Sequence, residues 1–322
     1  MDFSQQYNEK LITAKEAANL VKDGDWIDIG WGALTAKAFD EALAKRVDEL
    51  HDVKVRGGVV PYELAICKAD STGEHFVYHS FHSSGTERGL INNNKYGAYF
   101  IPVKYSEIGR YFNENLDKAS ISVIQVSPMD KNGNFNFGLS ASHAWATFKN
   151  ADKVILEVNE NVPVALGGYL NYINIKDVDY IYEANEEMLT LGKANYGEVE
   201  LKVAEYVVDL LKDGDCLQIG IGALPNAIGS EIAKSDLKDL GIHTEMYVDA
   251  FVEMAKAGKI TGMKKNRDIG RQTYAFAAGS QELYDYVDHN EDLMAVPVNY
   301  ANDVDIIASL DNFVSINTAM QV

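Results

Sequence analysis

A glycine-rich loop, followed further along the chain by an acidic residue, is the feature of this sequence best suited to chemistry. The loop is Gly220-Ile221-Gly222-Ala223-Leu224, and the acid is Glu245. Glycines that lead into a helix expose backbone N–H groups, which can bind an oxyanion or a phosphate. A glutamate side chain is ionised at neutral pH, so it needs no base to act as a nucleophile. The pair therefore indicates a nucleophilic carboxylate beside an anion-binding loop.

The same residues have two other interpretations. An acid about twenty residues after a glycine loop is typical of dinucleotide-binding sites, where it binds a ribose. However, Pro225 stands where that motif has its third glycine. Alternatively, the glycines only permit a tight turn, and Glu245 is an ordinary surface carboxylate. We favour anion binding by the loop and a nucleophilic Glu245, with a nicotinamide-dependent dehydrogenase as a further alternative.

The loop lies within a predicted βαβ unit. Its elements are a turn, a strand, a helix with a proline in its first turn, and a second strand, at Lys212–Asp215, Cys216–Ile219, Asn226–Lys234 and Ile242–Tyr247. In such units ligands bind at the carboxyl ends of the strands. We therefore expect the glycine loop and Glu245 to meet at one edge of a sheet.

The first half of the chain repeats this plan. A shift of 190 residues places Leu20–Leu34 on Leu210–Leu224 with ten of fifteen positions identical and no gaps. The chain therefore contains two copies of one α/β unit. Continued without gaps, the alignment puts Val55 in the place of Glu245. This difference assigns the chemistry to the second copy and makes the first copy a scaffold.

The rest of the chain alternates predicted strands and helices, which implies mainly parallel sheets in an α/β protein. Thr13-Ala14-Lys15-Glu16 fits a capping box that starts a helix. An amphipathic helix begins near Glu198. The other predicted strands are Trp26–Ile29, Val53–Val60, Phe76–Phe81, Tyr99–Val103, Ser120–Val126, Lys153–Val158, Thr273–Phe276, Met294–Val298 and Ile306–Ala308; Met129–Leu139 is a predicted loop, and further helices are predicted at Ala36–Leu50, Ala141–Lys149, Asp249–Ala257 and Glu282–Val287.

Two domains are expected at this length of 322 residues, one over residues 1–190 and one over residues 191–322. The linker between them is expected within Asn185–Gly197. Ser315–Val322 is strand-like and carries no polar tail, so we expect the second domain to be interrupted at its C-terminus.

Composition excludes several classes of partner. The chain has 29 basic and 48 acidic residues, a net charge of −19, which argues against nucleic acid or an anionic membrane. The N-terminus has no apolar core of a signal peptide, and no apolar run is long enough to span a bilayer. We expect a cytoplasmic protein. Cys67 and Cys216 are then buried thiols rather than a disulfide.

Two further groups of residues are candidate ligand sites. His75, His79 and His82 have spacings that suggest a metal, but on a strand they do not share one face, so we predict no metal site. The stretch Lys256–Arg271 carries six basic residues. It is either a solvated loop, the commoner case, or a site for an anion such as the phosphates of coenzyme A.

Five motifs together resemble the acetyl-CoA hydrolase/transferase family of CoA-transferases. They are GIGALPNAI, GIHTEM, QVSPMDKNGNFNFG, EVNENVP and SINTAM, at Gly220–Ile228, Gly241–Met246, Gln125–Gly138, Glu157–Pro163 and Ser315–Met320. The resemblance covers the whole chain. Within the family, the sequence is most similar to members that use butyryl-CoA and acetate.

The resemblance implies two tandem domains of the NagB/RpiA/CoA-transferase fold and a ping-pong reaction. Glu245 would attack the acyl-CoA thioester and then carry CoA as a glutamyl thioester, before acetate takes the CoA. The glycine loop, Gly220 to Leu224, would bind CoA near the thioester. Coenzyme A is thus expected as co-substrate, without a metal, in a homo-oligomer that uses short-chain acyl-CoA and acetate or butyrate.

Two departures from the family pattern are visible. Gln321 stands where many relatives have glutamate, and the family continues beyond S-I-N-x-A with a segment that completes the second domain. The alternatives to butyryl-CoA:acetate transfer are transfer to or from 4-hydroxybutyrate, hydrolysis of the acyl-CoA, and a non-catalytic metabolite sensor of the same fold.

Overall fold

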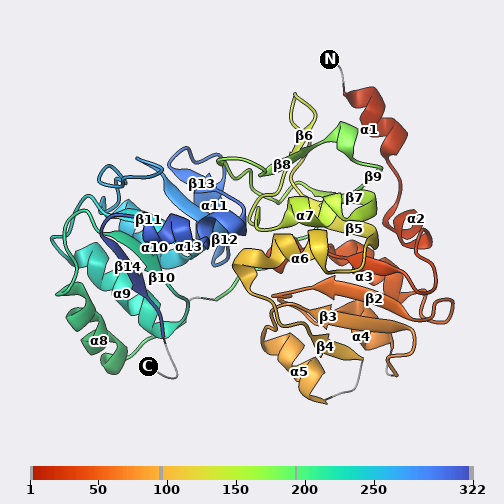
Figure 1. Ribbon diagram of the computed structural model, residues 1–322, viewed down its shortest axis with the longest axis horizontal. Coiled ribbons are helices and arrows are strands. Elements are labelled where there is room, and N and C mark those ends of the chain that lie inside the picture. Colours follow the sequence, from red (N-terminus) through yellow and green to blue (C-terminus); the bar gives the residue numbers. More distant parts are fainter. Residues whose placement is uncertain (1–2, 71, 94–96, 193, 319–322) are drawn as a thin grey trace. The chain divides into compact units, whose positions relative to one another are not determined.

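The computed structural model describes residues 3–70, 72–93, 97–192 and 194–318 (Figure 1). Contacts divide the chain into two compact units. Unit 1 comprises Met1–Val164 and Tyr172–Leu189, and unit 2 comprises Ala165–Asn171 and Thr190–Val322. The short segment Ala165–Asn171 belongs to unit 2, because Ala165 forms a β-bridge with Asp288 and Gly167 forms one with Ala295.

Unit 1 is built on a seven-stranded parallel sheet in the order β4-β3-β2-β1-β5-β7-β9. The strands are β1 (Trp26–Asp28), β2 (Val53–Gly57), β3 (Phe76–Ser80), β4 (Ala98–Phe100), β5 (Ala119–Val126), β7 (Ala151–Asn159) and β9 (Tyr180–Ala184). A separate antiparallel pair, β6 (Asn134–Asn136) and β8 (Tyr172–Asn174), includes part of Met129–Leu139, which had been predicted as a loop.

Helices cover both faces of this sheet (Figure 1). Ile121 and Val123 of β5 belong to a core shared with α2 to α5, whereas Ser122, which alternates with them, bonds to Thr147 of α7 at 3.1 Å. The predicted capping box is confirmed, since Thr13 and Glu16 bond to each other's backbone at the start of α2. The helices are α1 (Ser4–Lys10), α2 (Ala14–Asn19), α3 (Lys37–Ala44), α4 (Ala65–Ala69), α5 (Gly85–Asn93), α6 (Ile108–Glu114) and α7 (Ala144–Lys149).

Unit 2 repeats the central part of this topology. Its parallel sheet has the order β13-β12-β11-β10-β14, which matches β4-β3-β2-β1-β5 strand by strand. The predicted repeat and the predicted parallel α/β class are therefore confirmed. The elements are α8 (Glu198–Val208), β10 (Cys216–Ile219), α9 (Ala223–Lys234), β11 (Gly241–Tyr247), α10 (Asp249–Lys256), β12 (Gln272–Ala277), α11 (Gln281–Val287), β13 (Leu293–Ala295), α12 (Val298–Ala301), α13 (Val304–Ala308) and β14 (Phe313–Ile316).

One predicted strand is wrong. Ile306–Ala308 belongs to the helix α13, because the side chain of Asp303 caps that helix and accepts a hydrogen bond from the Ile306 N–H at 2.9 Å. The cap outweighs the preference of isoleucine for strands. Likewise, Val298 begins α12 after Pro297, so the strand predicted at Met294–Val298 is shorter. Residues 319–322, which include Gln321 and the end of the predicted strand-like terminus, lie outside the described residues.

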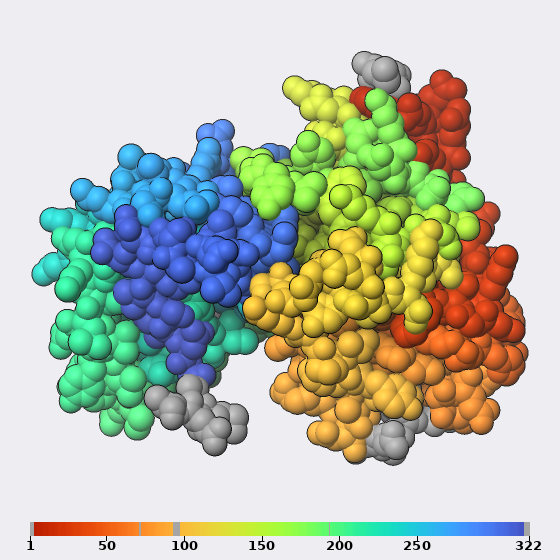
Figure 2. All heavy atoms as spheres, viewed as in Figure 1, coloured from red at the N-terminus to blue at the C-terminus, as the bar shows by residue number. Residues whose placement is uncertain are grey.

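Helix α8 is apolar on two sides. Ala204 is buried, with Leu201, Val207 and Val208 half-buried beside it, as an amphipathic helix requires. A second row of apolar side chains is exposed on unit 2, at Val199, Val203, Tyr206 and Leu210. Figure 2 shows helix α8 and the residues after it in green at the surface of unit 2. Among the residues that the structure covers, no helix has the length and apolar character needed to cross a membrane.

Buried histidines make the stability of the protein depend on pH. Burial lowers the pKa of His143 to about 3. The unfolded chain therefore binds a proton near pH 6.5 that the folded chain does not bind, and the stability contributed by the neutral ring is lost as pH falls from 6.5 toward 3. We expect acidification from pH 7 to pH 5 to lower the free energy of unfolding by about 2 kcal/mol through this residue alone. Urea unfolding of His143→Phe at both pH values should show a smaller difference; an unchanged difference would contradict this.

Candidate active site

The glycine loop follows β10 and leads directly into α9. Gly222 has φ of +117°, a conformation that side-chain-bearing residues rarely adopt, so the turn requires glycine. The N-cap of α9 is Gly222, which has no side chain to cap the helix, and the first helical residue is Ala223. A helix leaves its first backbone N–H groups without partners within the helix, so Ala223 and Leu224 present amides at the end of β10. The helix starts three residues earlier than predicted, and the loop amides belong to its first turn.

Glu245 lies on β11, four residues after its start toward the carboxyl end, and is half-buried. Asn302, the residue that follows α12, donates a hydrogen bond from Nδ2 to Glu245 Oε2. Sequence reasoning missed Asn302 because it lies 57 residues away in a segment with no motif. The amide thus holds one of the two carboxylate oxygens.

The register of the sheet places the loop level with Glu245. Cys216 pairs with Gly241 and Leu217 with Ile242, so the same offset brings Gly220 opposite Glu245. Within the described residues, this ladder stops at Leu217, whereas β10 pairs with β14 along all four of its residues. Strands β10 and β11 thus separate toward their carboxyl ends, where the loop and Glu245 lie.

The structure corrects the alignment of the two copies. Trp26 pairs with Lys54 in unit 1, while its counterpart Cys216 pairs with Gly241 in unit 2. The second strands therefore differ by 187 residues rather than 190, because three fewer residues connect β10 to β11. On this register the counterpart of Glu245 is Gly58, not Val55.

This correction strengthens the contrast between the two units. In unit 1 the indole of Trp31 covers Gly58, so closely that a Cβ at Gly58 would lie 2.4 Å from the ring. Trp31 is 5% exposed and stacks on Tyr105 at 5.2 Å between ring centroids. Its counterpart in unit 2, Ile221, is 61% exposed. One unit fills the end of its sheet with an aromatic ring, and the other leaves it open beside a carboxylate.

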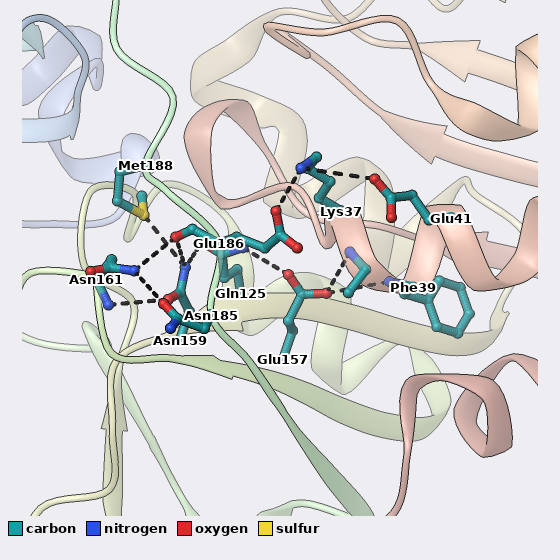
Figure 3. Close-up of polar contacts among 11 residues, drawn as sticks. Lys37, Phe39, Glu41, Gln125, Glu157, Asn159, Asn161, Asn185, Glu186 and Met188 are labelled. Atoms are coloured by element: carbon teal, nitrogen blue, oxygen red, sulfur yellow. Dashed lines mark hydrogen bonds and ion pairs between the residues drawn. The ribbon is translucent and has the colours of Figure 1, made fainter.

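The EVNENVP motif has a structural role in unit 1 (Figure 3). Glu157 is fully buried, accepts hydrogen bonds from the backbone N–H groups of Ala38 and Phe39, and so caps α3. It also accepts bonds from Tyr182 at 2.5 Å and from Gln125 at 2.7 Å. Burial raises the pKa of the Glu157 carboxyl.

The two asparagines of the motif hold the segment that leads out of unit 1. Asn159 Nδ2 and Asn161 Nδ2 both donate to the backbone oxygen of Glu186, at 2.8 and 3.0 Å. The side chain of Glu186 in turn pairs with Lys37 at 2.5 Å. These bonds fix the chain just before the boundary at Leu189 (Figure 3). The hydrogen bonds of Glu157, Asn159 and Asn161 therefore stabilise the fold of unit 1.

Three of the six basic residues in Lys256–Arg271 bond within unit 2. Lys265 is 4% exposed, and its ammonium donates to the oxygens of Ile242, Arg271 and Thr273. These acceptors lie at the amino-terminal ends of β11 and β12, away from the end that carries Glu245. Lys256 pairs with Glu282, and Lys259 donates to the backbone oxygen of Ser235. For these three lysines the geometry favours a structural role over binding of CoA phosphates beside the glycine loop.

The other candidate groups have ordinary contacts. His75 bonds to the backbone oxygen of Leu50, and the ring of His79 lies against Trp26 at 5.0 Å. Cys67 and Cys216 are buried free thiols. A cavity of about 720 Å³ lies in unit 1 beside α1, but it is lined by Glu160 and Glu183, which would repel an anionic ligand such as CoA.

Comparison with known proteins identifies the family. The model of the acetyl-CoA hydrolase/transferase N-terminal domain matches residues 1–191, and that of the C-terminal domain matches residues 279–322. The chain belongs to the acetyl-CoA hydrolase/transferase family. The predicted resemblance is thereby confirmed.

Individual members of the acetyl-CoA hydrolase/transferase family are similar to this chain over nearly its whole length. A butyryl-CoA:acetate CoA-transferase of Anaerostipes caccae is 50% identical over 100% of this chain and 72% of its own length. A protein of Syntrophomonas wolfei, named probable butyrate:acetyl-CoA coenzyme A-transferase, is 47% identical over 99% of this chain and 71% of its own length. The crystal structure of RipA from Yersinia pestis, 30% identical, superposes with a TM-score of 0.92 over 100% of this chain and 76% of that one. The predicted enzyme class, a CoA-transferase, is confirmed by these relatives.

Proposed function

We propose that the protein moves CoA between butyryl-CoA and acetate, with Glu245 as the covalent nucleophile. The observation that carries the proposal is the contrast between units: one sheet end is filled by Trp31, and the other presents Glu245 level with Gly220. The names of the two relatives at 50% and 47% identity support butyryl-CoA and acetate as the substrates.

The proposed reaction proceeds in four balanced steps. The Glu245 carboxylate attacks the thioester carbonyl, the C–S bond breaks, and CoA leaves as its thiolate, which gives a mixed anhydride. The thiolate attacks the glutamyl carbonyl and releases butyrate, so CoA is now a thioester of Glu245. Acetate attacks this thioester and displaces the thiolate, which then attacks the acetyl carbonyl. Acetyl-CoA leaves, and the carboxylate of Glu245 is restored.

The residues around Glu245 have defined parts in this scheme. Each attack creates a tetrahedral oxyanion, and the amides at the start of α9 are donors suited to stabilise it. Gly220 and Gly222 keep the backbone free of side chains where the thioester approaches. Asn302 orients the carboxylate for attack. Coenzyme A serves as co-substrate; the absence of a metal, a homo-oligomeric state and a cytoplasmic location remain predictions.

Removal of the Asn302 amide should slow transfer without preventing substrate binding. We expect Asn302→Ala to lower kcat by about 100-fold, since misplacement of a reacting group by about 1 Å costs that much, with a small change in KM. The assay follows acetyl-CoA formed from butyryl-CoA and acetate.

The matched control is Asn299→Ala, which removes an exposed asparagine from the same short helix, α12. This control should keep the wild-type kcat. An Asn302→Ala variant as fast as the wild type would remove Asn302 from the site.

A further inference from the structure

His243 is a buried group that the proposed reaction does not yet use. It lies two residues before Glu245 on β11, on the same face of the strand, and is 1% exposed. Its Nε2 lies 2.8 Å from the backbone oxygen of Ala301. A carbonyl accepts, so Nε2 carries the proton and donates. Ala301 is the last residue of α12, and its carbonyl is one of those that a helix leaves without a donor of its own.

The bonded carbonyl belongs to the peptide group that joins Ala301 to Asn302. Asn302 in turn donates its side-chain amide to Glu245. The chain of contacts therefore starts and ends on β11: His243 holds the peptide, the peptide sets the Asn302 side chain, and that side chain holds the carboxylate. A planar peptide transmits the orientation of its carbonyl to the next residue.

The environment of the His243 ring keeps it neutral, with one tautomer bonded to the Ala301 carbonyl. Burial lowers the pKa of His243, so the imidazole is neutral with its proton on Nε2. The rings of Tyr300 and Phe313 lie 6.2 and 6.3 Å from it, and the Tyr300 hydroxyl donates to Asp268 at 2.9 Å. Two successive residues of α12 are thus held by hydrogen bonds, Tyr300 to Asp268 and Ala301 to His243.

The other ring nitrogen of His243 carries a cost in stability. Nδ1 of His243 is buried without a hydrogen-bond partner among the described residues. A buried polar atom without a partner costs stability, and an apolar side chain of similar size would avoid that cost. From these contacts we infer that His243 is a positioning residue for CoA transfer, acting through the Ala301 carbonyl and Asn302 on Glu245. This inference rests on the proposed function.

Three substitutions separate positioning from packing. Glutamine can place an N–H donor near the position of Nε2, asparagine reaches only as far as Nδ1, and leucine provides no donor. We expect His243→Leu and His243→Asn to lower kcat about 10-fold or more, with KM for butyryl-CoA within about twofold of wild type. His243→Gln should recover kcat to within about threefold. The unfolding midpoint of His243→Leu should fall below that of wild type, because the Ala301 carbonyl loses its donor.

The experiment measures kcat, KM and unfolding midpoint for all three variants, with His289→Asn as the control at an exposed histidine. Equal kcat values for the glutamine and asparagine variants would overturn the inference, and so would a leucine variant with the wild-type kcat. If the leucine variant does not fold, comparison of kcat between the glutamine and asparagine variants still tests the inference. Mass spectrometry of the wild type with butyryl-CoA is run in parallel. Failure to form a CoA adduct there would contradict the proposed function itself, independently of His243.

Discussion

Glu245→Gln should abolish CoA transfer, with kcat/KM reduced by about 10,000-fold or more. Glutamine has the size of glutamate and can still bond to Asn302, so the fold and the contact survive. Its amide does not attack a thioester, however, and without the nucleophile the covalent route is closed. The measurement is the rate of acetyl-CoA formation from butyryl-CoA and acetate.

Glu245→Asp refines this prediction. Aspartate keeps the carboxylate, but its side chain is one methylene shorter, so the carboxylate lies closer to the backbone of β11. We expect kcat about 100-fold below wild type, because a shift of about 1 Å from the attacking position has that effect. A variant as active as wild type would show that the position of the carboxylate is not constrained.

The control is Glu253→Gln, an exposed glutamate on α10 of the same unit. It should have wild-type rates and the same unfolding midpoint as Glu245→Gln. Wild-type transfer by Glu245→Gln would refute the nucleophilic role, and equal loss in both variants would indicate a general effect of removing charge from unit 2.

Arg56→Met should cause the largest loss of stability, about 3–5 kcal/mol in the free energy of unfolding. Arg56 is 1% exposed and bonds to Asp28 through two nitrogens, at 2.7 and 3.2 Å, and to the backbone oxygen of Asp117. Its guanidinium also lies over the ring of Trp26 at 5.0 Å. Burial already raises the pKa of Asp28 to about 6 in spite of the arginine, so removal of the cation leaves a carboxylate in an apolar site.

The double variant Asp28→Leu/Arg56→Met tests that explanation. It removes both charges, so it should recover most of the loss. The control is Arg110→Met, which breaks an exposed pair with Glu107 and should change stability by at most about 1 kcal/mol. Urea unfolding at pH 7 measures all three. A loss below about 1 kcal/mol in Arg56→Met, or a double variant less stable than the single, would contradict the account.

The repeat and its glycines could be predicted from sequence because local signals define them. Lys22-Asp23-Gly24-Asp25 and Lys212-Asp213-Gly214-Asp215 both turn the chain with glycine at positive φ, and a buried strand follows each turn. These turns need no distant partner. The parallel order of strands then follows from the alternation of strands and helices.

Register and distant partners could not be predicted in the same way. A gapless alignment matched Val55 with Glu245, since it cannot detect that the connection between the paired strands is three residues shorter in unit 2. Pairing across the sheet reveals Gly58 as the true counterpart. Similarly, His243 lies in the GIHTEM motif, but its link to Asn302 through the Ala301 carbonyl arises only when the chain folds. Asn302 belongs to none of the motifs.

The helix α13 shows how a cap decides between two structures. Ile306 and Ile307 favour a strand by side-chain type. Asp303 satisfies the Ile306 N–H at 2.9 Å and thereby starts a helix. An aspartate three positions before a short run of β-branched residues is visible in the sequence. Its capping of a helix should outweigh the preference of that run for a strand.

The most direct test of the central claim is mass spectrometry of the purified protein after incubation with butyryl-CoA. We predict a CoA thioester on the peptide that contains Glu245, its loss when acetate is added, and its absence in Glu245→Gln. A CoA adduct on a different residue, or acetyl-CoA formation by a protein that never carries CoA, would contradict the claim that this carboxylate is the covalent carrier.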